Sequence, residues 1–170
     1  MTPLKIFLLD ANVFIEAAKR YYAFDIAPGY WNALIKHATN GHVRSIDKIK
    51  VEIDRVNDEL KTWVGRNYHQ WFESTRQQDV IDAYAIVMVW AQGQNHYTDG
   101  AQAEFARSAD GWLIAFALAK GCIVVTHEQY DPVGKREIKI PNACKGVGVP
   151  YMDTFGMLRE LGVRFHIHSQ

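Results

Sequence analysis

The sequence has very little cysteine and no excess of charge of either sign. Its two cysteines, Cys122 and Cys144, do not form a Cys-x-x-Cys pair. A zinc ribbon or a disulfide framework is therefore disfavoured, and both thiols are expected to be reduced in a cytoplasmic protein. Lysine plus arginine equals aspartate plus glutamate, at 19 each, so the formal net charge is zero. Charge alone thus gives no indication of a nucleic-acid partner, although a local basic rim stays compatible with one.

Long hydrophobic runs are also missing. The longest unbroken apolar run, 83–91, is far shorter than the roughly 18–20 residues that span a membrane. The apolar run before Asp10 is too short for a signal peptide. The chain contains no internal repeat or linker, and its 170 residues suit one domain with a sizeable core. We therefore expect a single cytoplasmic domain over 1–170, without membrane contact.

Strand patterns alternate with helical patterns along the chain. Continuous apolar or β-branched runs indicate buried parallel strands, and shorter runs indicate weaker ones. The expected strands are 5–9, 42–46, 122–126, 138–140, 149–152 and 163–168. Apolar residues at steps of three and four indicate helices. The expected helices are 13–21, 30–39, 48–63, 75–92, 101–107, 108–120 and 154–161. This alternation predicts an α/β fold with a central, mostly parallel sheet and helices on both faces.

Loops are expected where glycine, proline and polar residues gather. The expected loops are 24–29, 93–100, 127–137 and 142–150. Asp47 and Asp153 are expected to cap the helices that follow them, and Gly121 to end the helix before it. The segment around 68–107 is expected to add extra helical material to the domain.

Four acidic residues stand at the ends of these elements. Asp10 and Glu128 follow the two clearest strands, and Glu52 and Asp110 lie near helix starts. In a parallel sheet, strand ends and the following helix starts share one edge, so four carboxylates can converge there. Like charges so close resist ionisation, and a divalent cation removes that difficulty. Oxygen ligands suit Mg²⁺, and such ions can activate water for phosphodiester cleavage.

Structural explanations and other enzyme classes compete with this interpretation. Asp10 can simply cap the next helix, and Glu52 near a helix N-terminus gains about 0.3–1 kcal/mol from the helix dipole. The sequence has no G-x-S-x-G elbow and no phosphate-binding P-loop. An aspartyl phosphatase normally resembles D-x-D-x-T after its first strand, and Asn12 at the third position makes that match weak.

The residues around the acids resemble the motif regions of PIN-domain nucleases. The regions that carry the resemblance are Leu-Leu-Asp-Ala-Asn-Val-Phe-Ile at 8–15, Ser-Ile-Asp-Lys-Ile-Lys-Val-Glu at 45–52, Ala-Asp-Gly-Trp-Leu-Ile-Ala at 109–115 and Val-Val-Thr-His-Glu at 124–128. Together they span nearly the whole chain. The segment Arg-Tyr-Tyr-Ala-Phe-Asp at 20–25 is similar to a PIN-like branch catalogued as a domain of unknown function and related to VapC-type toxins.

The resemblance implies a metal-dependent endoribonuclease with RNA as its substrate. It implies that Mg²⁺ or Mn²⁺ is held by Asp10, Glu52, Asp110 and Glu128. It also implies that Asn12 and Thr126 support the site by hydrogen bonding. Many compact bacterial and archaeal members are toxins of toxin–antitoxin pairs, which implies a small antitoxin protein and a homodimer as partners.

Two departures from the family pattern matter. Glu128 stands where Asp is commoner and is preceded by His127, so Asp131 is a substitute candidate for the fourth acid. The chain is also longer than the compact toxins, which weakens the toxin assignment more than the nuclease assignment. The alternative is a catalytically degenerate PIN-like protein-binding module. RNA against DNA, the target sequence and the oligomeric state stay open at this point.

Overall fold

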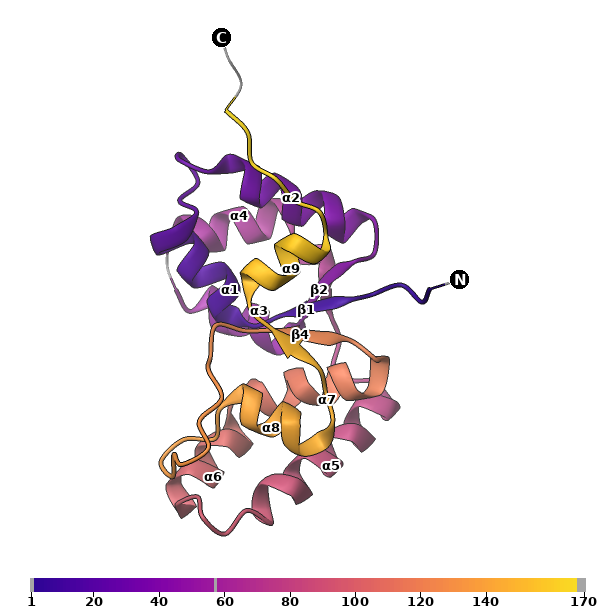
Figure 1. Cartoon of the computed structure of the whole chain (residues 1–170), viewed down its shortest axis with the longest axis vertical. Helices are drawn as coiled ribbons and strands as arrows, with labels where there is room; N and C mark the ends of the chain where they lie inside the picture. The colour runs from indigo at the N-terminus through magenta and orange to yellow at the C-terminus, as the bar shows by residue number, and fades with distance from the viewer. Residues whose placement is uncertain (1, 57, 168–170) are drawn as a thin grey trace.

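Five parallel strands form one sheet within residues 2–56 and 58–167, the part of the chain that the computed structural model describes (Figure 1). The strands are β1 (Phe7–Leu9), β2 (Val43–Ile46), β3 (Phe72–Glu73), β4 (Ile123–Val125) and β5 (Tyr151–Met152). Their order across the sheet is β3-β2-β1-β4-β5, and each neighbouring pair is parallel. Phe7 is paired with Val43 on one side and with Ile123 on the other, which places β1 at the centre.

Helices cover both faces of this sheet, as predicted. They are α1 (Ala11–Glu16), the π-helix η1 (Ala17–Tyr21), α2 (Pro28–Thr39), α3 (Asp47–Asp54), α4 (Glu59–Asn67), the 3₁₀-helix η2 (His69–Trp71), α5 (Gln78–Gln92), α6 (Asp99–Arg107), α7 (Asp110–Lys120), α8 (Ile140–Val147) and α9 (Thr154–Glu160). In Figure 1, α1, α2, α4 and α9 lie on one side of the strands and α5, α6, α7 and α8 on the other. The predicted fold class, a mostly parallel α/β sheet with helices on both faces, is confirmed.

The core explains why the central strands read as continuous apolar runs. Phe7, Leu8 and Leu9 of β1 are all buried, because helices pack on both sides of the strand. On one of these sides α7 packs against α5, and glycine at position 111 makes that approach close. A Cβ atom at Gly111 would lie 2.6 Å from Met88 Cε. No helix within the described ranges is long and apolar enough to cross a membrane.

The strand order reverses direction between β1 and β4. From β1 the chain proceeds through α1, η1 and α2 to β2 on one side, whereas from β4 it proceeds through α8 to β5 on the other. Such a reversal is a topological switch point, and open α/β sheets bind their ligands outside the carboxyl ends of the strands at this place. The residues that immediately follow β1 and β4 therefore lie where this type of fold binds its ligands.

The prediction of a single long helix over 48–63 is wrong. α3 ends at Asp54 and α4 begins at Glu59. Asp58 caps α4, because its carboxylate accepts a hydrogen bond of 2.9 Å from the Leu60 backbone N–H. Asp47 is the first residue of α3 and not its N-cap, and its carboxylate accepts hydrogen bonds from Thr75.

Two of the expected loops are in fact places where helices begin. The loop expected over 24–29 ends early, because Pro28 and Gly29 form the first turn of α2. The strand expected over 138–140 and the loop expected over 142–150 are wrong, because α8 occupies 140–147. Proline is well suited to the first turn of a helix, where its missing N–H costs nothing. Gly148, with φ of 78°, ends α8 in the left-handed conformation.

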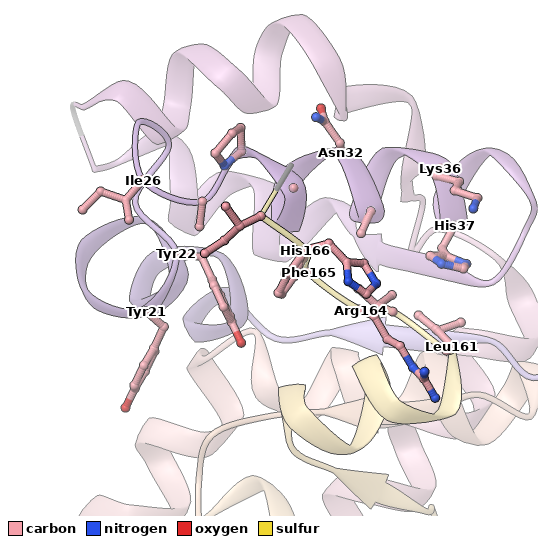
Figure 2. Close-up of a pocket in the computed structure, with 17 residues that line it drawn as sticks. Tyr21, Tyr22, Ile26, Asn32, Lys36, His37, Leu161, Arg164, Phe165 and His166 are labelled. Carbon is pink, nitrogen blue, oxygen red and sulfur yellow. The ribbon is translucent and has the colours of Figure 1, made fainter. Parts of the chain in front are cut away.

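The strand expected in the C-terminal tail is absent from residues 163–167, and His168 lies outside the described residues. The tail crosses the surface of α2, where it borders a pocket of about 1080 Å³ (Figure 2). Phe165 anchors it there: its ring centroid is 5.7 Å from that of Tyr22, and its ring would be 3.2 Å from a Cβ at Gly29. The nearby α9 buries Leu158, whereas Phe155 is 37% exposed.

Candidate functional site

Asp10 and Thr126 meet at the switch point. Asp10 follows β1, and its backbone N–H donates to the Val125 carbonyl of β4 at 3.0 Å. One carboxylate oxygen of Asp10 accepts from the Ala11 N–H at 2.7 Å and so caps α1. The other accepts from the Thr126 hydroxyl at 3.1 Å. Asp10 is only 4% exposed, so its carboxylate is fixed in a dry environment between the two strand ends.

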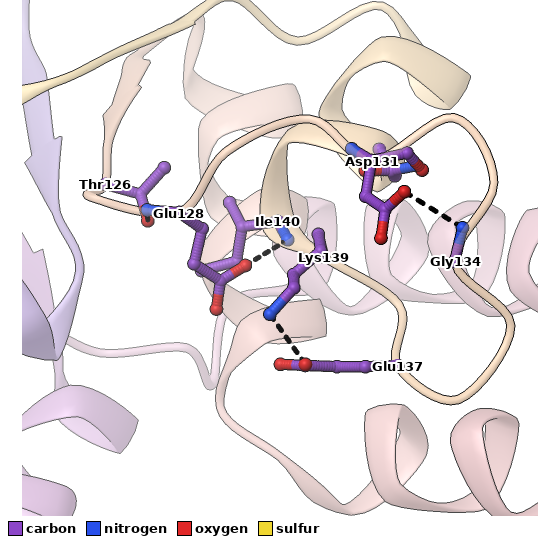
Figure 3. Close-up of polar contacts among 8 residues, drawn as sticks. Thr126, Glu128, Asp131, Gly134, Glu137, Lys139 and Ile140 are labelled. Carbon is purple, nitrogen blue, oxygen red and sulfur yellow. Dashed lines mark hydrogen bonds and ion pairs between the residues drawn. The ribbon is translucent and has the colours of Figure 1, made fainter.

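Glu128 lies beside this pair and is fixed by two hydrogen bonds. Its backbone N–H donates to Thr126 Oγ1 at 3.1 Å. Its carboxylate accepts from the Ile140 N–H at 2.7 Å, at the start of α8 (Figure 3). Thr126 therefore connects the two acids, since its hydroxyl donates to the Asp10 carboxylate and accepts from the Glu128 backbone.

Asp110 and Glu52 approach from the other strand-to-helix connections. Asp110 is the first residue of α7, and its backbone N–H donates to Ser108 Oγ at 3.3 Å. Glu52 extends from α3. Burial raises the pKa of its carboxyl, and the charge of Arg55 and a hydrogen bond from the Ala109 backbone partly oppose this. The Glu52 side chain thus reaches the N-terminal end of α7, next to Asp110.

Burial and the charges of these acids raise the pKa of the two most buried members of the set, Asp10 and Asp110. Burial, followed by the charge of Glu128, raises the pKa of Asp10 to about 7. Burial, followed by the charges of Asp10, Glu128 and Glu52, raises the pKa of Asp110 to about 8. Burial is also the main cause of the raised pKa of Glu128. The structure therefore brings all four sequence-predicted acids into one electrostatic cluster.

The donor chemistry of this cluster fits a hard divalent cation. The four acids offer only carboxylate oxygens, and none of them forms an ion pair with lysine or arginine within the described ranges. As the side chains are placed, no three histidine, cysteine or acidic groups of residues 2–56 and 58–167 are arranged as a ready-made metal cage. Mg²⁺ is usually held by only one or two carboxylates, together with waters and substrate phosphate. The arrangement is therefore compatible with Mg²⁺ or Mn²⁺.

The sequence match to a known family covers almost the whole chain. Residues 7–165 match the model of a family described as Domain of unknown function (DUF4411). The chain belongs to the DUF4411 family. No curated protein matches the sequence. The predicted assignment to a branch catalogued as a domain of unknown function is thereby confirmed.

Two solved structures share the fold of this DUF4411 protein. One is FitAcB from Neisseria gonorrhoeae, with 14% identity, a TM-score of 0.52, and coverage of 86% of this chain and 96% of that chain. The other is VapBC2 from Rickettsia felis bound to a DNA fragment from their promoter, with 12% identity, a TM-score of 0.53, and coverage of 87% and 98%. At such identities the similarity establishes the PIN-like fold, in agreement with the prediction.

The two residues predicted to support the site behave differently in this DUF4411 protein. Thr126 makes the expected hydrogen bond to Asp10. Asn12 is exposed, and its side chain makes no hydrogen bond to another described residue. It lines a pocket of about 230 Å³ together with Glu128. Asn12 is therefore placed to contact a ligand directly and not to hold Asp10.

Asp131, the substitute candidate for the fourth acid, lies apart from the cluster. Its carboxylate accepts hydrogen bonds from the backbone N–H groups of Val133 at 3.1 Å and Gly134 at 3.0 Å, within its own loop (Figure 3). Its charge is not among the causes that shift the pKa of Asp10 or Asp110. Glu128, and not Asp131, is the acid of this loop that joins the cluster.

Sequence reasoning missed several residues at the rim of the site. Glu137 adds to the raised pKa values of Asp110 and Glu128, and it forms a 2.6 Å ion pair with Lys139 (Figure 3). It lies in irregular chain, where no periodic pattern could mark it. Glu16 lines the small pocket with Asn12, and their spacing of four residues on α1 is a signal that could have found it.

Proposed function

We propose that this protein is a divalent-metal-dependent ribonuclease of PIN type that hydrolyses phosphodiester bonds. The observation that carries the proposal is the convergence of Asp10, Glu52, Asp110 and Glu128 at the switch point, where none of them forms an ion pair with lysine or arginine within the described ranges. In addition to burial, the charges of Glu128 and Glu52 raise the pKa of Asp10, and the charges of these three acids raise the pKa of Asp110, so a bound cation would relieve the repulsion at these two carboxylates. A mainly structural role would be served as well by neutral caps or by ion pairs.

The four acids would contribute unequally to metal binding. Asp10 and Asp110 have the most strongly raised pKa values and lie deepest, so we assign them as the principal ligands of Mg²⁺ or Mn²⁺. Glu52 and Glu128 complete the acidic rim. When bound, the ion would supply charge neutralisation, Lewis-acid stabilisation of phosphate oxygens and activation of water.

The remaining residues would orient this cluster and admit the substrate. Thr126 holds one oxygen of Asp10, and the Ala11 N–H holds the other, so that carboxylate cannot rotate freely. The Ile140 N–H holds one oxygen of Glu128. Asn12 lies at the open pocket, where its amide can donate to a phosphate oxygen or a ribose hydroxyl.

We further propose that the protein acts as the toxin of a toxin–antitoxin pair, with a small antitoxin protein as its partner and a homodimer as its assembly. The resemblance to PIN-domain nucleases supports this, as does the shared fold with the chains of FitAcB and VapBC2. Co-expression with the product of the neighbouring gene tests it, because an antitoxin should co-purify and suppress cleavage.

A catalytically degenerate protein-binding module is the second candidate. Two observations favour it: the carboxylates do not form a ready-made cage among the described residues, and Glu128 is engaged by the start of α8. Metal binding separates the two functions. A catalytic site should bind Mn²⁺ and raise the melting temperature by mass action, whereas a degenerate site should not.

Cleavage of a panel of RNA and single-stranded DNA with Mg²⁺ or Mn²⁺ tests the nuclease. Asp10→Asn and Asp110→Asn should each reduce cleavage by at least about 100-fold, because each removes a charge that holds the ion. Glu104→Gln is the matched control, since Glu104 is an exposed acid paired with Arg107 on α6. Cleavage that survives in either active-site variant would contradict the assignment. No cleavage and no stabilisation by Mn²⁺ would favour the binding module.

A further inference from the structure

Tyr21 and Tyr22 are adjacent in sequence and line the same large pocket, but their rings contact different aromatic partners. The Tyr22 N–H donates to the Ala17 carbonyl at 2.7 Å, five residues back, which closes the wide π-helical turn. The Tyr22 ring stacks on Tyr30, with centroids 4.4 Å apart and an interplanar angle of 11°. Tyr21 points away from the tail residue Phe165 (Figure 2) and is 52% exposed. π-helical turns of this kind frequently mark functional sites.

Tyr21 forms an exposed aromatic surface with two rings from distant parts of the chain. Its ring stacks on His127, with centroids 5.8 Å apart at 29°, and meets Phe155 edge-on at 6.1 Å and 84°. His127 lies in the loop after β4, and its Nε2 is 3.1 Å from Thr154 Oγ1 at the start of α9. η1, this loop and α9 are thus connected at one place. We call Tyr21, His127 and Phe155 the aromatic platform.

The aromatic platform borders the acidic cluster. Tyr21 and His127 line the same small pocket as Asn12 and Glu128. A ligand that places a phosphate at the acids can therefore place an adjoining group against the rings. The buried aromatic residues of the core, such as Phe14 and Tyr30, are fully enclosed, whereas Phe155 and Tyr21 keep much of their surface in solvent.

The charges around the platform select which part of a nucleic acid can bind there. The carboxylates of Asp153 and Glu16 both act on His127, and Glu128 lines the same pocket. Glu16 is paired with Arg20 at 3.1 Å, whereas Asp153 and Glu128 form no ion pair within the described ranges. Without a bound cation these two carboxylates repel phosphate, so the rings themselves are poorly suited to contact the backbone. A nucleobase is uncharged and has an aromatic face, and base–aromatic stacking tolerates any sequence.

We propose that the aromatic platform is a base-stacking site that holds an unpaired base of the substrate next to the phosphate at the acidic cluster. In a duplex each base is already stacked on its neighbours, so a duplex cannot offer a free base face without unstacking. This inference rests on the proposed nuclease function, but it concerns binding, which can be measured without cleavage.

The direct test is fluorescence anisotropy with a fluorescein-labelled, mixed-sequence single-stranded RNA of roughly 12 nucleotides, in the absence of divalent ions. Tyr21→Ala and Phe155→Ala should weaken binding by about 5- to 100-fold, the range found for loss of one base–aromatic stack. Tyr21→Trp should bind the RNA as tightly as the wild type, because it keeps an aromatic ring at this position. Phe165→Ala is the matched control, because Phe165 is an exposed aromatic residue on the far side of Tyr22. Its binding should equal that of the wild type.

A second readout separates stacking from a structural effect of the same substitutions. An RNA with 2-aminopurine in place of adenine should lose fluorescence on binding to the wild type and to Tyr21→Trp, but not to Tyr21→Ala. Single-stranded DNA should behave like RNA, since stacking needs no 2′-hydroxyl, and duplex RNA should bind at least about tenfold more weakly. Thermal melting checks that each variant is folded.

The outcomes distinguish this inference from the nuclease proposal. If Tyr21→Ala binds and quenches like the wild type, or if Phe165→Ala is the variant that loses binding, the platform is overturned even when the protein cleaves RNA. If Tyr21-dependent binding and quenching occur without any metal-dependent cleavage, the base-stacking proposal is supported and the nuclease proposal is contradicted.

Discussion

Asp10 shows that a structural and a functional interpretation of one residue need not compete. It caps α1 with one oxygen, as a helix-capping aspartate does, and presents the other to Thr126 at the switch point. The burial that fixes it also raises its pKa to about 7. Burial likewise raises the pKa of Asp110, to about 8. Both residues therefore hold protons near neutral pH in the metal-free protein, and this links stability to pH.

The metal-free protein should become less stable as pH rises from about 4 to about 8. Folded-state pKa values of about 7 for Asp10 and about 8 for Asp110 lie above the ordinary value of 3.8. The folded protein thus binds more protons than the unfolded chain in this window, so the stabilisation is complete below the unfolded pKa and is lost as pH passes the folded one. Each tenfold difference in proton affinity between the folded and unfolded states corresponds to about 1.4 kcal/mol of stability.

Urea denaturation in EDTA at about pH 5 and about pH 8 measures this loss, which should amount to a few kcal/mol. Asp10→Asn and Asp110→Asn should flatten the dependence, because an amide does not titrate. Asp79→Asn is the control, since Asp79 is an exposed acid paired with Lys120. A wild-type protein whose stability is unchanged between these two pH values would show that the carboxylates do not share a dry site.

At the scale of elements, the buried central strands were easier to predict than the edge strands and the helix boundaries. β1 and β4 are short, continuous and buried, so their composition alone marks them. α8 was missed because its start depends on Glu128, which accepts from the Ile140 N–H across twelve positions of chain. The break between α3 and α4 was missed because Asp58 occupies the N-cap position of α4 and not a position in the interior of one long helix. The spacing of apolar residues at steps of three and four predicts neither the Glu128–Ile140 hydrogen bond nor the Asp58 cap.

Two substitutions of Glu128 would separate its structural role from the catalytic role that we propose for it. Glu128→Gln keeps an oxygen that can accept from the Ile140 N–H, so the melting temperature should barely change while cleavage falls. Glu128→Ala loses the hydrogen bond as well, and should also destabilise the protein by about 1 kcal/mol. Thermal melting and cleavage assays on both variants test this. Full activity in Glu128→Gln would mean that Glu128 only caps α8.

At the scale of the whole molecule, topology placed the four acids better than any local motif. Parallel strands share one carboxyl edge, so acids at strand ends were expected to meet, and Asp10, Glu52, Asp110 and Glu128 do share one cluster. Tyr21 and Phe155 could not be predicted in the same way. Their contact depends on a π-helix and on the return of α9 across the sheet, neither of which a strand-and-helix pattern specifies.

The balanced net charge predicts weak salt dependence of nucleic-acid binding. Lysine plus arginine equals aspartate plus glutamate, and acids surround the aromatic platform, so few phosphate contacts are expected. The slope of log K against log salt is about −0.7 for each neutralised phosphate of a single strand. A slope shallower than about −1.5 is therefore expected. Anisotropy titrations at several KCl concentrations measure it, and a steep slope would indicate a basic binding surface instead.

The separation of Asp10 and Thr126 along the chain has a consequence for synthesis in the cell. They are 116 positions apart, and β4 must be inserted beside β1 before they can meet. While the chain is still emerging from the ribosome, Asp10 is made early but has neither Thr126 nor Glu128 beside it. A growing or prematurely terminated chain therefore lacks the assembled cluster. A nuclease built in this way would be inert toward the messenger and ribosomal RNA that surround it during its own translation.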